Sequence, residues 1–325
     1  MPRRLISATK SEIDKMTPLE LKNSIRASEG RTILSQTYVG TEPLVENTIN
    51  AEVSNAFGAD MVFLNGYSMD PDSNLSGLHT LFEDSKEADL NGTHDLRVKD
   101  VKKLVHMPVG IYLECGIGDD ENTATNNTTQ MVRPDRIASD ENLKRAVDEK
   151  VDFIVLGGNP GTGTSLETII DSTRRAKRII GDKAMIWAGK WEDGVNEKVL
   201  GDPLRKDSKE RIADLIDAGA DVICLPMPGS RQGVTTEEIR DLVTFTHEYG
   251  DKSTLAMTFL DGSVEGSDEA TVRACALMSK QTGADIHATG DAGNHGISQP
   301  EDIYQIAITI KGRRLTWGKM AGGNR

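Results

Sequence analysis

The sequence predicts a (β/α)8 TIM barrel with an N-terminal helical extension. Eight short, β-rich apolar segments alternate with segments of helical periodicity, and this alternation is typical of parallel strands joined by helices. The tripeptide GAD precedes three of the apolar segments, at residues 58, 219 and 283, where glycine suits the end of a helix and aspartate opens a strand. Eight such units without a break in composition favour a closed barrel over an open doubly wound sheet.

Each predicted strand begins one strand–helix unit after the previous one. The strands are expected at residues 32–38, 61–66, 109–115, 152–158, 184–190, 221–226, 253–259 and 285–291. The two longest intervals follow the second and third strands and consist of polar sequence, so they predict long loops. Because active sites lie at the C-terminal ends of barrel strands, we expect both loops to border the site.

The segments outside the predicted barrel are short. Residues 1–30 predict the helical extension, in which Leu19, Leu21 and Ile25 can close the barrel floor. Residues 31–315 form the predicted barrel, and residues 316–325 form a C-terminal tail. The tail could dock on a neighbouring subunit, so we expect a homo-oligomer.

The composition excludes several classes of partner. The 325 residues carry a formal charge of -13 without a cluster of Lys and Arg, which argues against nucleic acid. No stretch approaches the roughly 18 apolar residues of a membrane span, and no apolar segment follows the basic N-terminus as in a secretory signal. Three widely separated cysteines predict neither a disulfide framework nor a zinc ribbon. We therefore expect a cytoplasmic protein whose partner is a small-molecule substrate.

Glu114 and Lys190 are candidate catalytic residues at the ends of the third and fifth predicted strands. A carboxylate at a strand end can ligate Mg²⁺ or act as a general base, and the structural alternative is an ion pair between Glu114 and Lys190. Lys190 could form a Schiff base, hold a phosphate or carboxylate as a point charge, or neutralise Glu114. The point-charge roles are favoured over the covalent one.

His287 and Asp291 are further candidates at the end of the eighth strand, where Thr289 lies between them on the same face. If that face points into the barrel, it provides an acid/base pair or metal ligands. If it does not, His287 is an ordinary packed histidine. Cys115 and Cys224 also lie at strand ends, but buried cysteines are commoner than reactive ones and neither enters the mechanism.

Other strand ends and the glycine-rich loops supply candidate substrate contacts. The polar residues at the ends of the first, second and fourth strands are Gln36, Asn65 and Asn159. A barrel usually builds its phosphate site from its last loops, although glycine in such loops is also explained by turn geometry. The loop residues concerned are Gly290, Gly293 and Gly296, with Arg231 as a helper.

Two local motifs are rejected. The loop GNPGTGTS at residues 158–165 lacks both the lysine of a Walker A loop and a full GxGxxG pattern. The segment TFLDGSVEGSDE at residues 258–269 resembles the opening motif of haloacid dehalogenase-like hydrolases. Phe259 stands where that family has its nucleophilic aspartate, so we attribute the match to chance.

The third predicted strand carries a family resemblance. The segment MPVGIYLECGIGDDEN resembles the third-strand segment of the phosphoenolpyruvate mutase and isocitrate lyase superfamily, and the residues that fit are Pro108, Val109, Glu114, Gly116 and Gly118. VENTINAEVSNAFGADMVFLNGYSM is similar to that family's first helix and second strand. The resemblance implies that Glu114 takes the place of a Mg²⁺-associated acid and that Asn65 and Gly66 lie near a substrate carboxylate. Tyr112 stands where the family has the first acid of its pair, and the Lys-Cys-Gly-His type of lid motif is missing from residues 116–139.

Together these observations favour a lyase or mutase that acts on a small carboxylate, phospho acid or phosphono acid with the help of Mg²⁺. Glu114 would hold or act through Mg²⁺, Lys190 would neutralise enolate charge, and Asp291 with His287 would supply acid/base groups. Two alternatives remain open: a metal-free phosphosugar aldolase or epimerase, and a non-catalytic barrel that binds a metabolite.

Overall fold

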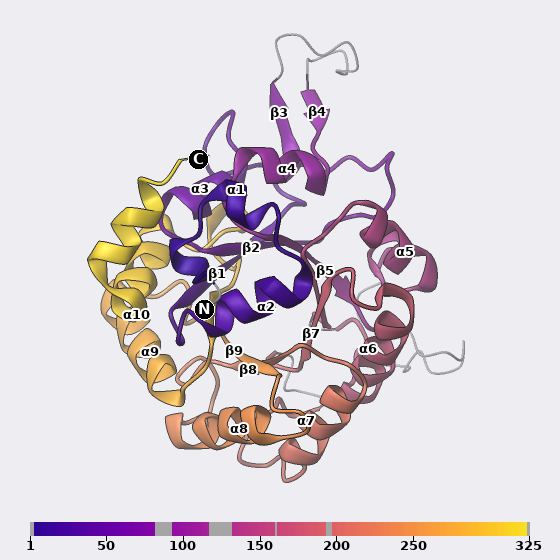
Figure 1. Ribbon diagram of the computed structural model, residues 1–325, viewed down its shortest axis with the longest axis vertical. Coiled ribbons are helices and arrows are strands. Elements are labelled where there is room, and N and C mark those ends of the chain that lie inside the picture. Colours follow the sequence, from indigo (N-terminus) through magenta and orange to yellow (C-terminus); the bar gives the residue numbers. More distant parts are fainter. Residues whose placement is uncertain (1–2, 82–92, 117–131, 160, 193–196, 324–325) are drawn as a thin grey trace.

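Eight parallel strands close into a barrel, and helices form a ring around it (Figure 1). The computed structural model describes residues 3–81, 93–116, 132–159, 161–192 and 197–323. This is the predicted (β/α)8 TIM barrel. In their order around the barrel, the strands are β1 (Thr32–Tyr38), β2 (Met61–Asn65), β5 (Val109–Glu114), β6 (Phe153–Gly157), β7 (Met185–Gly189), β8 (Val222–Pro226), β9 (Leu255–Leu260) and β10 (Ile286–Thr289).

The aspartate that opens alternate strands explains why the strand starts are so regular. Each of these carboxylates accepts a hydrogen bond from a backbone N–H of the preceding strand, at 2.8 to 3.0 Å. Each also contacts a basic side chain from another part of the chain, at 2.7 to 2.9 Å. The four pairs are Asp60 with Lys311, Asp152 with Lys102, Asp221 with Lys22, and Asp285 with His247. The repeated unit seen in the sequence therefore fixes the register of neighbouring strands.

The helices that surround the barrel begin at ordinary capping residues. The side chain of Ser165 accepts a hydrogen bond from the N–H of Thr168 at 3.2 Å, and Asp268 accepts one from Thr271 at 2.8 Å, so α6 and α9 start there. The surrounding helices are α3 (Asn50–Ala56), α4 (Val98–Leu104), α5 (Asp140–Asp148), α6 (Leu166–Ile180), α7 (Ser208–Asp217), α8 (Thr236–Glu248), α9 (Glu269–Thr282) and α10 (Pro300–Met320).

One of the two predicted long loops carries secondary structure of its own. After β2, the strands β3 (His79–Leu81) and β4 (Thr93–Asp95) form an antiparallel pair that extends away from the barrel (Figure 1). The other long loop, after β5, falls largely on residues 117–131, which lie outside the described residues, as does Gly118. Its last part is the short 3-10 helix η3 (Pro134–Arg136).

The N-terminal extension closes the floor of the barrel. It consists of η1 (Leu5–Ser7), α1 (Lys10–Ile13) and α2 (Pro18–Arg26), which lie across the end of the barrel that faces the viewer in Figure 1. Leu21 and Ile25 are buried against the barrel interior, as predicted. The prediction for Leu19 is wrong, because its side chain is 68% exposed, and Leu5 and Ile13 pack into the interior instead.

The C-terminal end of the chain is helical where a tail was predicted. Gly312, with φ 76°, interrupts α10, and the helix then continues to Met320. Thr316 and Lys319 are buried, so most of the predicted tail packs against the body of the protein.

The cysteines and the helices bear on two of the sequence-based expectations. All three cysteines are free and buried. Within the described ranges, no helix combines the length and the apolar character that crossing a membrane requires.

Candidate functional site

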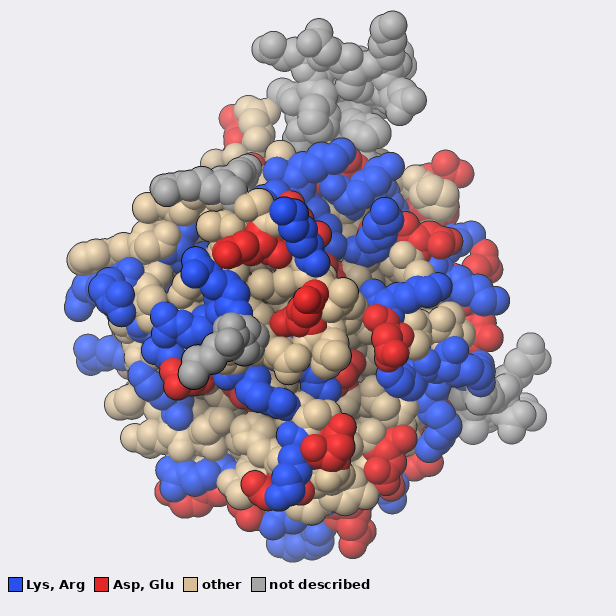
Figure 2. Space-filling model, viewed as in Figure 1, with Lys and Arg blue, Asp and Glu red and all other residues tan. Residues whose placement is uncertain are grey.

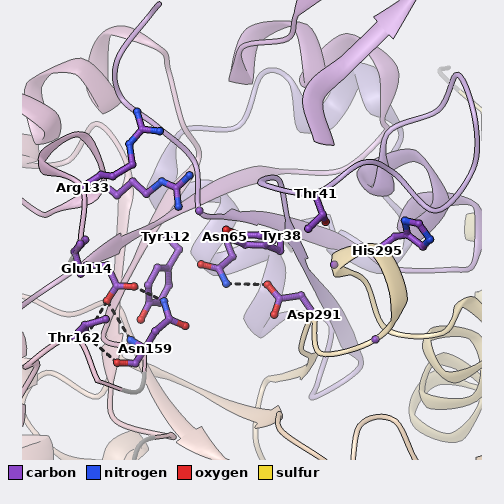
Figure 3. A pocket seen from close by; sticks show the side chains of 15 residues that line it. Tyr38, Thr41, Asn65, Tyr112, Glu114, Arg133, Asn159, Thr162, Asp291 and His295 are labelled. Atoms are coloured by element: carbon purple, nitrogen blue, oxygen red, sulfur yellow. Dashed lines mark hydrogen bonds between the residues drawn. The ribbon is translucent and has the colours of Figure 1, made fainter. Parts of the chain in front are cut away.

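A cavity of about 740 Å³ opens at the C-terminal ends of the barrel strands. Figure 3 shows Glu114, Asn159 and Thr162 on one side of it and Asn65 and Asp291 on the other. The lining residues are Tyr38, Thr41, Asn65, Gly66, Tyr112, Glu114, Val132, Arg133, Arg136, Asn159, Thr162, Asp291, Gly293, His295 and Gly296. The position at the C-terminal end agrees with that of active sites in other barrels.

Glu114, the last residue of β5, is a buried carboxylate on the wall of this cavity. Its oxygens accept hydrogen bonds from the Asn159 N–H at 3.1 Å, the Asn159 side-chain amide, and the Thr162 hydroxyl at 3.5 Å. Burial raises the pKa of Glu114 to about 7, although these bonds and the nearby Arg136 lower it. In the described part of the chain, no ion pair joins Glu114 to Lys190, so the structural alternative for Glu114 is not observed.

Tyr112 lies two residues before Glu114 and also lines the cavity. Its hydroxyl is buried and has no hydrogen-bond partner among the described residues. The absence of a side chain on Gly157 makes room for it, because a Cβ there would lie 2.9 Å from the Tyr112 oxygen. Together with Trp191, whose ring meets that of Tyr112 edge-on with centroids 6.2 Å apart, Tyr112 forms an aromatic layer beneath the cavity. A buried hydroxyl without a partner is unusual, and its place beside the cavity is consistent with a polar group that a ligand or an ordered water would supply.

Asp291 faces Glu114 from the opposite wall. The Asn65 side-chain amide donates a hydrogen bond to it at 2.8 Å, across 226 residues of sequence. Burial raises the pKa of Asp291 to about 6, and the hydrogen bonds from Asn65 and Gln36 lower it. The fold therefore brings together three residues that were predicted from three different strand ends: Gln36, Asn65 and Asp291.

His287 does not belong to this site, which corrects its candidacy as a catalytic residue. Its Nε2 lies 3.1 Å from the Gly30 carbonyl, which can only accept, so the proton is on Nε2. Its Nδ1 then accepts from the Ser279 hydroxyl at 2.6 Å, and Ser279 accepts from Thr258 at 2.5 Å. Burial lowers the pKa of His287 to about 4. The ring is a neutral, packed histidine directed toward α9.

Lys190 and Arg231 are also absent from the described residues that line the cavity. Lys190 follows β7 and is 3% exposed. Arg231 lies 3.8 Å from the Asp261 carboxylate, whose other oxygen accepts from the N–H of Gly262. The expectation that Lys190 and Arg231 contact a substrate therefore has no geometric support.

The glycine-rich loop after β10 is poorly suited to a phosphate. The N–H of Gly290 bonds to the Leu260 carbonyl, and the N–H of Ala292 donates to the Glu265 carboxylate at 3.1 Å. Gly290 is needed for packing, because a Cβ there would lie 2.2 Å from Glu265 Oε2. Gly293 and Gly296 do line the cavity, but the N–H groups of Gly290 and Ala292 in the same loop are already used by Leu260 and Glu265.

Sequence reasoning missed the basic residues of the cavity. Arg133 and Arg136 reach it from the segment that follows the undescribed part of the loop after β5. Arg133 is paired with Asp135 at 2.9 Å, whereas the Arg136 side chain has no hydrogen bond or ion pair within the described ranges, and its Nε is buried. No spacing in the sequence pointed to Arg136, because a long loop separates it from its strand.

Two further acids were missed beneath the cavity. Asp261 directly follows β9 and accepts a hydrogen bond from the Trp191 indole at 3.2 Å. Burial and the neighbouring Asp261 raise the pKa of Glu192 far above its usual range. The strand-end criterion that selected Asp291 would also have selected Asp261, had the motif around it not been set aside as a chance match.

The described residues contain no group of three or more His, Cys, Asp or Glu that could hold a metal ion. Mg²⁺, however, usually keeps several waters and takes only one or two carboxylates from the protein, with further oxygens from its substrate. Glu114 and Asp291 are oxygen donors on the cavity wall, and burial raises the pKa of each, so a cation in the cavity would favour their ionised forms. The residues present therefore fit a water-rich Mg²⁺ site and do not fit an all-protein cage.

Comparison with solved structures shows a fold shared with an aldolase and a carboxyl transferase domain. An archaeal fructose 1,6-bisphosphate aldolase matches with 12% identity and a TM-score of 0.52, covering 91% of this chain and 100% of that one. The carboxyl transferase domain of Rhizobium etli pyruvate carboxylase matches with 12% identity and a TM-score of 0.53, covering 97% of this chain and 53% of that one. A 2,3-dimethylmalate lyase, a member of the PEP mutase/isocitrate lyase superfamily, matches with 14% identity and a TM-score of 0.48, covering 84% of this chain and 81% of that one.

Sequence comparison gives a more direct assignment. A search of curated proteins found no significant match. One family model matches residues 6–325, and the chain therefore belongs to the family described as "Domain of unknown function (DUF7916)".

Proposed function

We propose that this protein is an enzyme that cleaves or rearranges a C–C or P–C bond in a small oxyacid, as a lyase or an isomerase. The observation that carries the proposal is Glu114: a buried carboxylate on the cavity wall, held by Asn159 and Thr162, with a pKa of about 7. A group with a pKa near neutrality is present in both protonation states, and this suits proton transfer.

Each wall of the cavity carries a carboxyl group that can donate or accept a proton. On one side, Glu114 exchanges a proton with the substrate while Asn159 keeps the carboxylate oriented. On the other side, Asp291 has a pKa of about 6 and is held by Asn65, so it is the more readily ionised of the two. Two carboxyl groups with different pKa values permit one to act as a base while the other donates a proton.

Arg136 is the group best placed to hold the acidic part of a substrate. Arg136 lines the cavity, lies close enough to Glu114 to lower that residue's pKa, and forms no ion pair within the described part of the chain. A planar guanidinium matches a carboxylate or phosphate with two hydrogen bonds. Arg136 therefore takes over the charge-neutralising role expected of Lys190.

Mg²⁺ is part of this proposal because of the donor set described above. Asp291 would hold it in place of acting as a base, and Glu114 would meet it only through a bound water, so that proton exchange stays with Glu114. When bound, Mg²⁺ supplies a Lewis acid that stabilises negative charge on a substrate oxygen.

The alternative of a Schiff-base aldolase requires a reactive amine in the cavity. Lys190 does not line the cavity, so the geometry favours the first proposal over this one. Borohydride treatment with carbonyl substrates separates the two, because only a Schiff base would give a covalent adduct, and loss of that adduct in Lys190→Met would assign it to Lys190.

The test is a thermal-shift screen of small carboxylates, phosphosugars and phosphonates with and without Mg²⁺, followed by turnover assays on every ligand that stabilises the protein. A ligand that binds the folded state raises the unfolding midpoint by mass action. We expect a small oxyacid to do so, Arg136→Gln to abolish its effect, and Glu114→Gln to keep binding but lose turnover. A ligand that binds yet is never converted would support the metabolite-binding alternative and overturn the proposed activity.

A further inference from the structure

A second cavity, of about 480 Å³, lies at the opposite end of the barrel from the candidate active site. It is enclosed by residues 6–10 of the N-terminal extension, His106, and the last turns of α10 with the three residues that follow. Its ionisable lining residues are Lys10, His106, Arg314 and Lys319, and none of the described residues that line it is Asp or Glu. The cavity is therefore basic although the whole chain carries a formal charge of -13.

Lys319 is the buried charge of this cavity. It is 5% exposed, and its amine donates one hydrogen bond, to the His106 carbonyl at 2.7 Å. The carboxylate that acts on it, Asp60, is already paired with Lys311 at 2.7 Å, and both of those side chains are fully buried. Asp60 is thus the single carboxylate that acts on both Lys311 and Lys319. Burial, together with the positive charge of Lys311, lowers the pKa of Lys319 to about 8. A buried cation without a full counter-charge favours an added anion.

Other donors of this cavity also lack partners. The Ser7 hydroxyl is buried and has no hydrogen-bond partner among the described residues. Arg314 is exposed at the rim, and within the described part of the chain its guanidinium has no ion pair. Lys10 is paired with Asp14 at 2.7 Å and so contributes less charge.

His106 has a structural part in the cavity. Its Nε2 donates to the Lys319 carbonyl at 2.9 Å, and its Nδ1 lies 3.0 Å from the Asn55 amide, so the ring is neutral. Burial and the neighbouring Lys319 lower the pKa of His106, which is consistent with that state. The ring therefore holds α10 in place and leaves Lys319 and Arg314 as the cationic groups.

We propose that this cavity binds a phosphate-class oxyanion, either inorganic phosphate or the phosphate group of a metabolite. Lys319 and Arg314 supply positive charge, and the Ser7 hydroxyl supplies a hydrogen bond. A phosphate suits donors that come from separate segments, because its several oxygens can accept from all of them. On this end of the molecule, Lys and Arg side chains gather over α10 and beside the N-terminal segment (Figure 2), which favours approach of an anion.

Binding there would join two separate parts of the fold. Residues 5–8 plug the barrel floor, with Leu5 and Ala8 in the interior cluster, whereas Lys319 and Arg314 belong to α10. An anion held between them would tie the plug to the outer helix ring, so its binding is expected to stabilise the folded protein.

The experiment measures thermal unfolding of the full chain as inorganic phosphate replaces chloride at constant ionic strength. The protein carries Arg136→Gln, so that anion binding at the candidate active site does not contribute. We expect the unfolding midpoint to rise with phosphate, and Ser7→Ala and Arg314→Gln each to weaken the apparent Kd about five- to tenfold. Arg313→Gln is the matched control, because Arg313 is exposed on the same helix and does not line the cavity.

Further arms identify the source of the phosphate and the role of Lys319. Glycerol phosphate in place of inorganic phosphate reports whether the cavity accepts a phosphate monoester. Lys319→Met should abolish the rise of the unfolding midpoint with phosphate. If this variant fails to fold, Ser7→Ala and Arg314→Gln still decide the test. Equal stabilisation in the parent, Ser7→Ala and Arg314→Gln proteins would overturn the proposal, as would a midpoint that does not respond to phosphate at tens of millimolar.

Discussion

The two ends of the barrel bury charge of opposite sign and in different ways. At the C-terminal mouth, Glu114 and Asp291 line an open cavity, and burial raises their pKa values to about 7 and about 6. At the N-terminal floor, burial lowers the pKa of Lys319 to about 8 next to the buried Asp60–Lys311 pair. The floor combines a hydrophobic plug, a buried ion pair and the cation Lys319, whereas the mouth keeps titratable acids without cationic partners in contact. Unpaired buried charge is costly, so its retention at both ends supports the roles proposed for them.

The mouth is most directly tested by Glu114→Gln. The exchange keeps the size of the side chain and removes the proton-transfer group, so we expect turnover of the identified substrate to fall about 10²- to 10⁴-fold. Steady-state kinetics measure the effect, with Glu141→Gln as the control because Glu141 is exposed on α5. If Glu114→Gln kept more than about a tenth of the parent activity, the loss would be smaller than that expected for a proton-transfer group. Glu114 would then have no part in the mechanism.

At the floor, Lys311→Met should have the largest effect on stability. It leaves the fully buried Asp60 without its partner, and breaking such a pair typically costs about 3–5 kcal/mol. Urea denaturation measures the loss. The control is Lys252→Met, which breaks an exposed pair with Glu248 and should cost less than about 1 kcal/mol. Similar losses in both variants would mean that the floor pair has no special role.

The two ends should also respond oppositely to pH. Glu114 has its pKa raised from 4.5 to about 7, so the folded state binds its proton more tightly, and the resulting stability is lost as pH rises from about 4.5 to about 7. Lys319 has its pKa lowered from 10.5 to about 8, so the corresponding stability is lost as pH falls from about 10.5 to about 8. At about 1.4 kcal/mol per pKa unit, each contribution is ~3 kcal/mol.

The measurement is the free energy of unfolding against pH in phosphate-free buffer, for the parent, Glu114→Gln and Lys319→Met proteins. Each variant should lose only its own pH-dependent contribution. A parent-minus-variant difference that does not change across these ranges would contradict the assignment of the perturbed groups.

Gly290→Ala should give the smallest effect and sharpen the description of the mouth. Its new Cβ would lie 2.2 Å from Glu265 Oε2 and 3.0 Å from Asp261 Oδ1, and such overpacking typically costs about 1–3 kcal/mol. Gly266→Ala is the matched control, because the nearest atom to its new Cβ is 4.0 Å away. Denaturation midpoints of the two variants should differ, and equal midpoints would show that the Glu265 side chain can move aside.

Sequence reasoning placed the barrel strands well and the site only in part. Each predicted strand boundary lies within two residues of the observed one, because hydrophobic periodicity and the recurring aspartate are local signals. Glu114, Asn159, Asn65 and Asp291 were found from their places at strand ends, and all line the cavity. Lys190 and His287 were chosen by the same strand-end criterion, but neither of them lines the cavity.

The difference has a physical reason. In a strand, neighbouring side chains alternate between the barrel interior and the helix layer, so a position error of one residue reverses the direction of a side chain. Hydrophobic periodicity did not fix that direction: His287, inside β10, points to the helix layer and bonds with Ser279 of α9, whereas Asp291 follows the strand and bonds with Asn65 of β2.

By itself, then, the sequence determined the fold class, the strand positions and the closure of the floor by Leu21 and Ile25, since all of these follow from the pattern of apolar residues. Only the tertiary structure decided which polar groups meet. It placed Arg136 beside Glu114 across a long loop, and it brought Ser7 and Lys319 to one cavity from the two ends of the chain. Contacts of this kind depend on the closure of the barrel and on side-chain direction. The local periodicity of apolar residues determines neither of these.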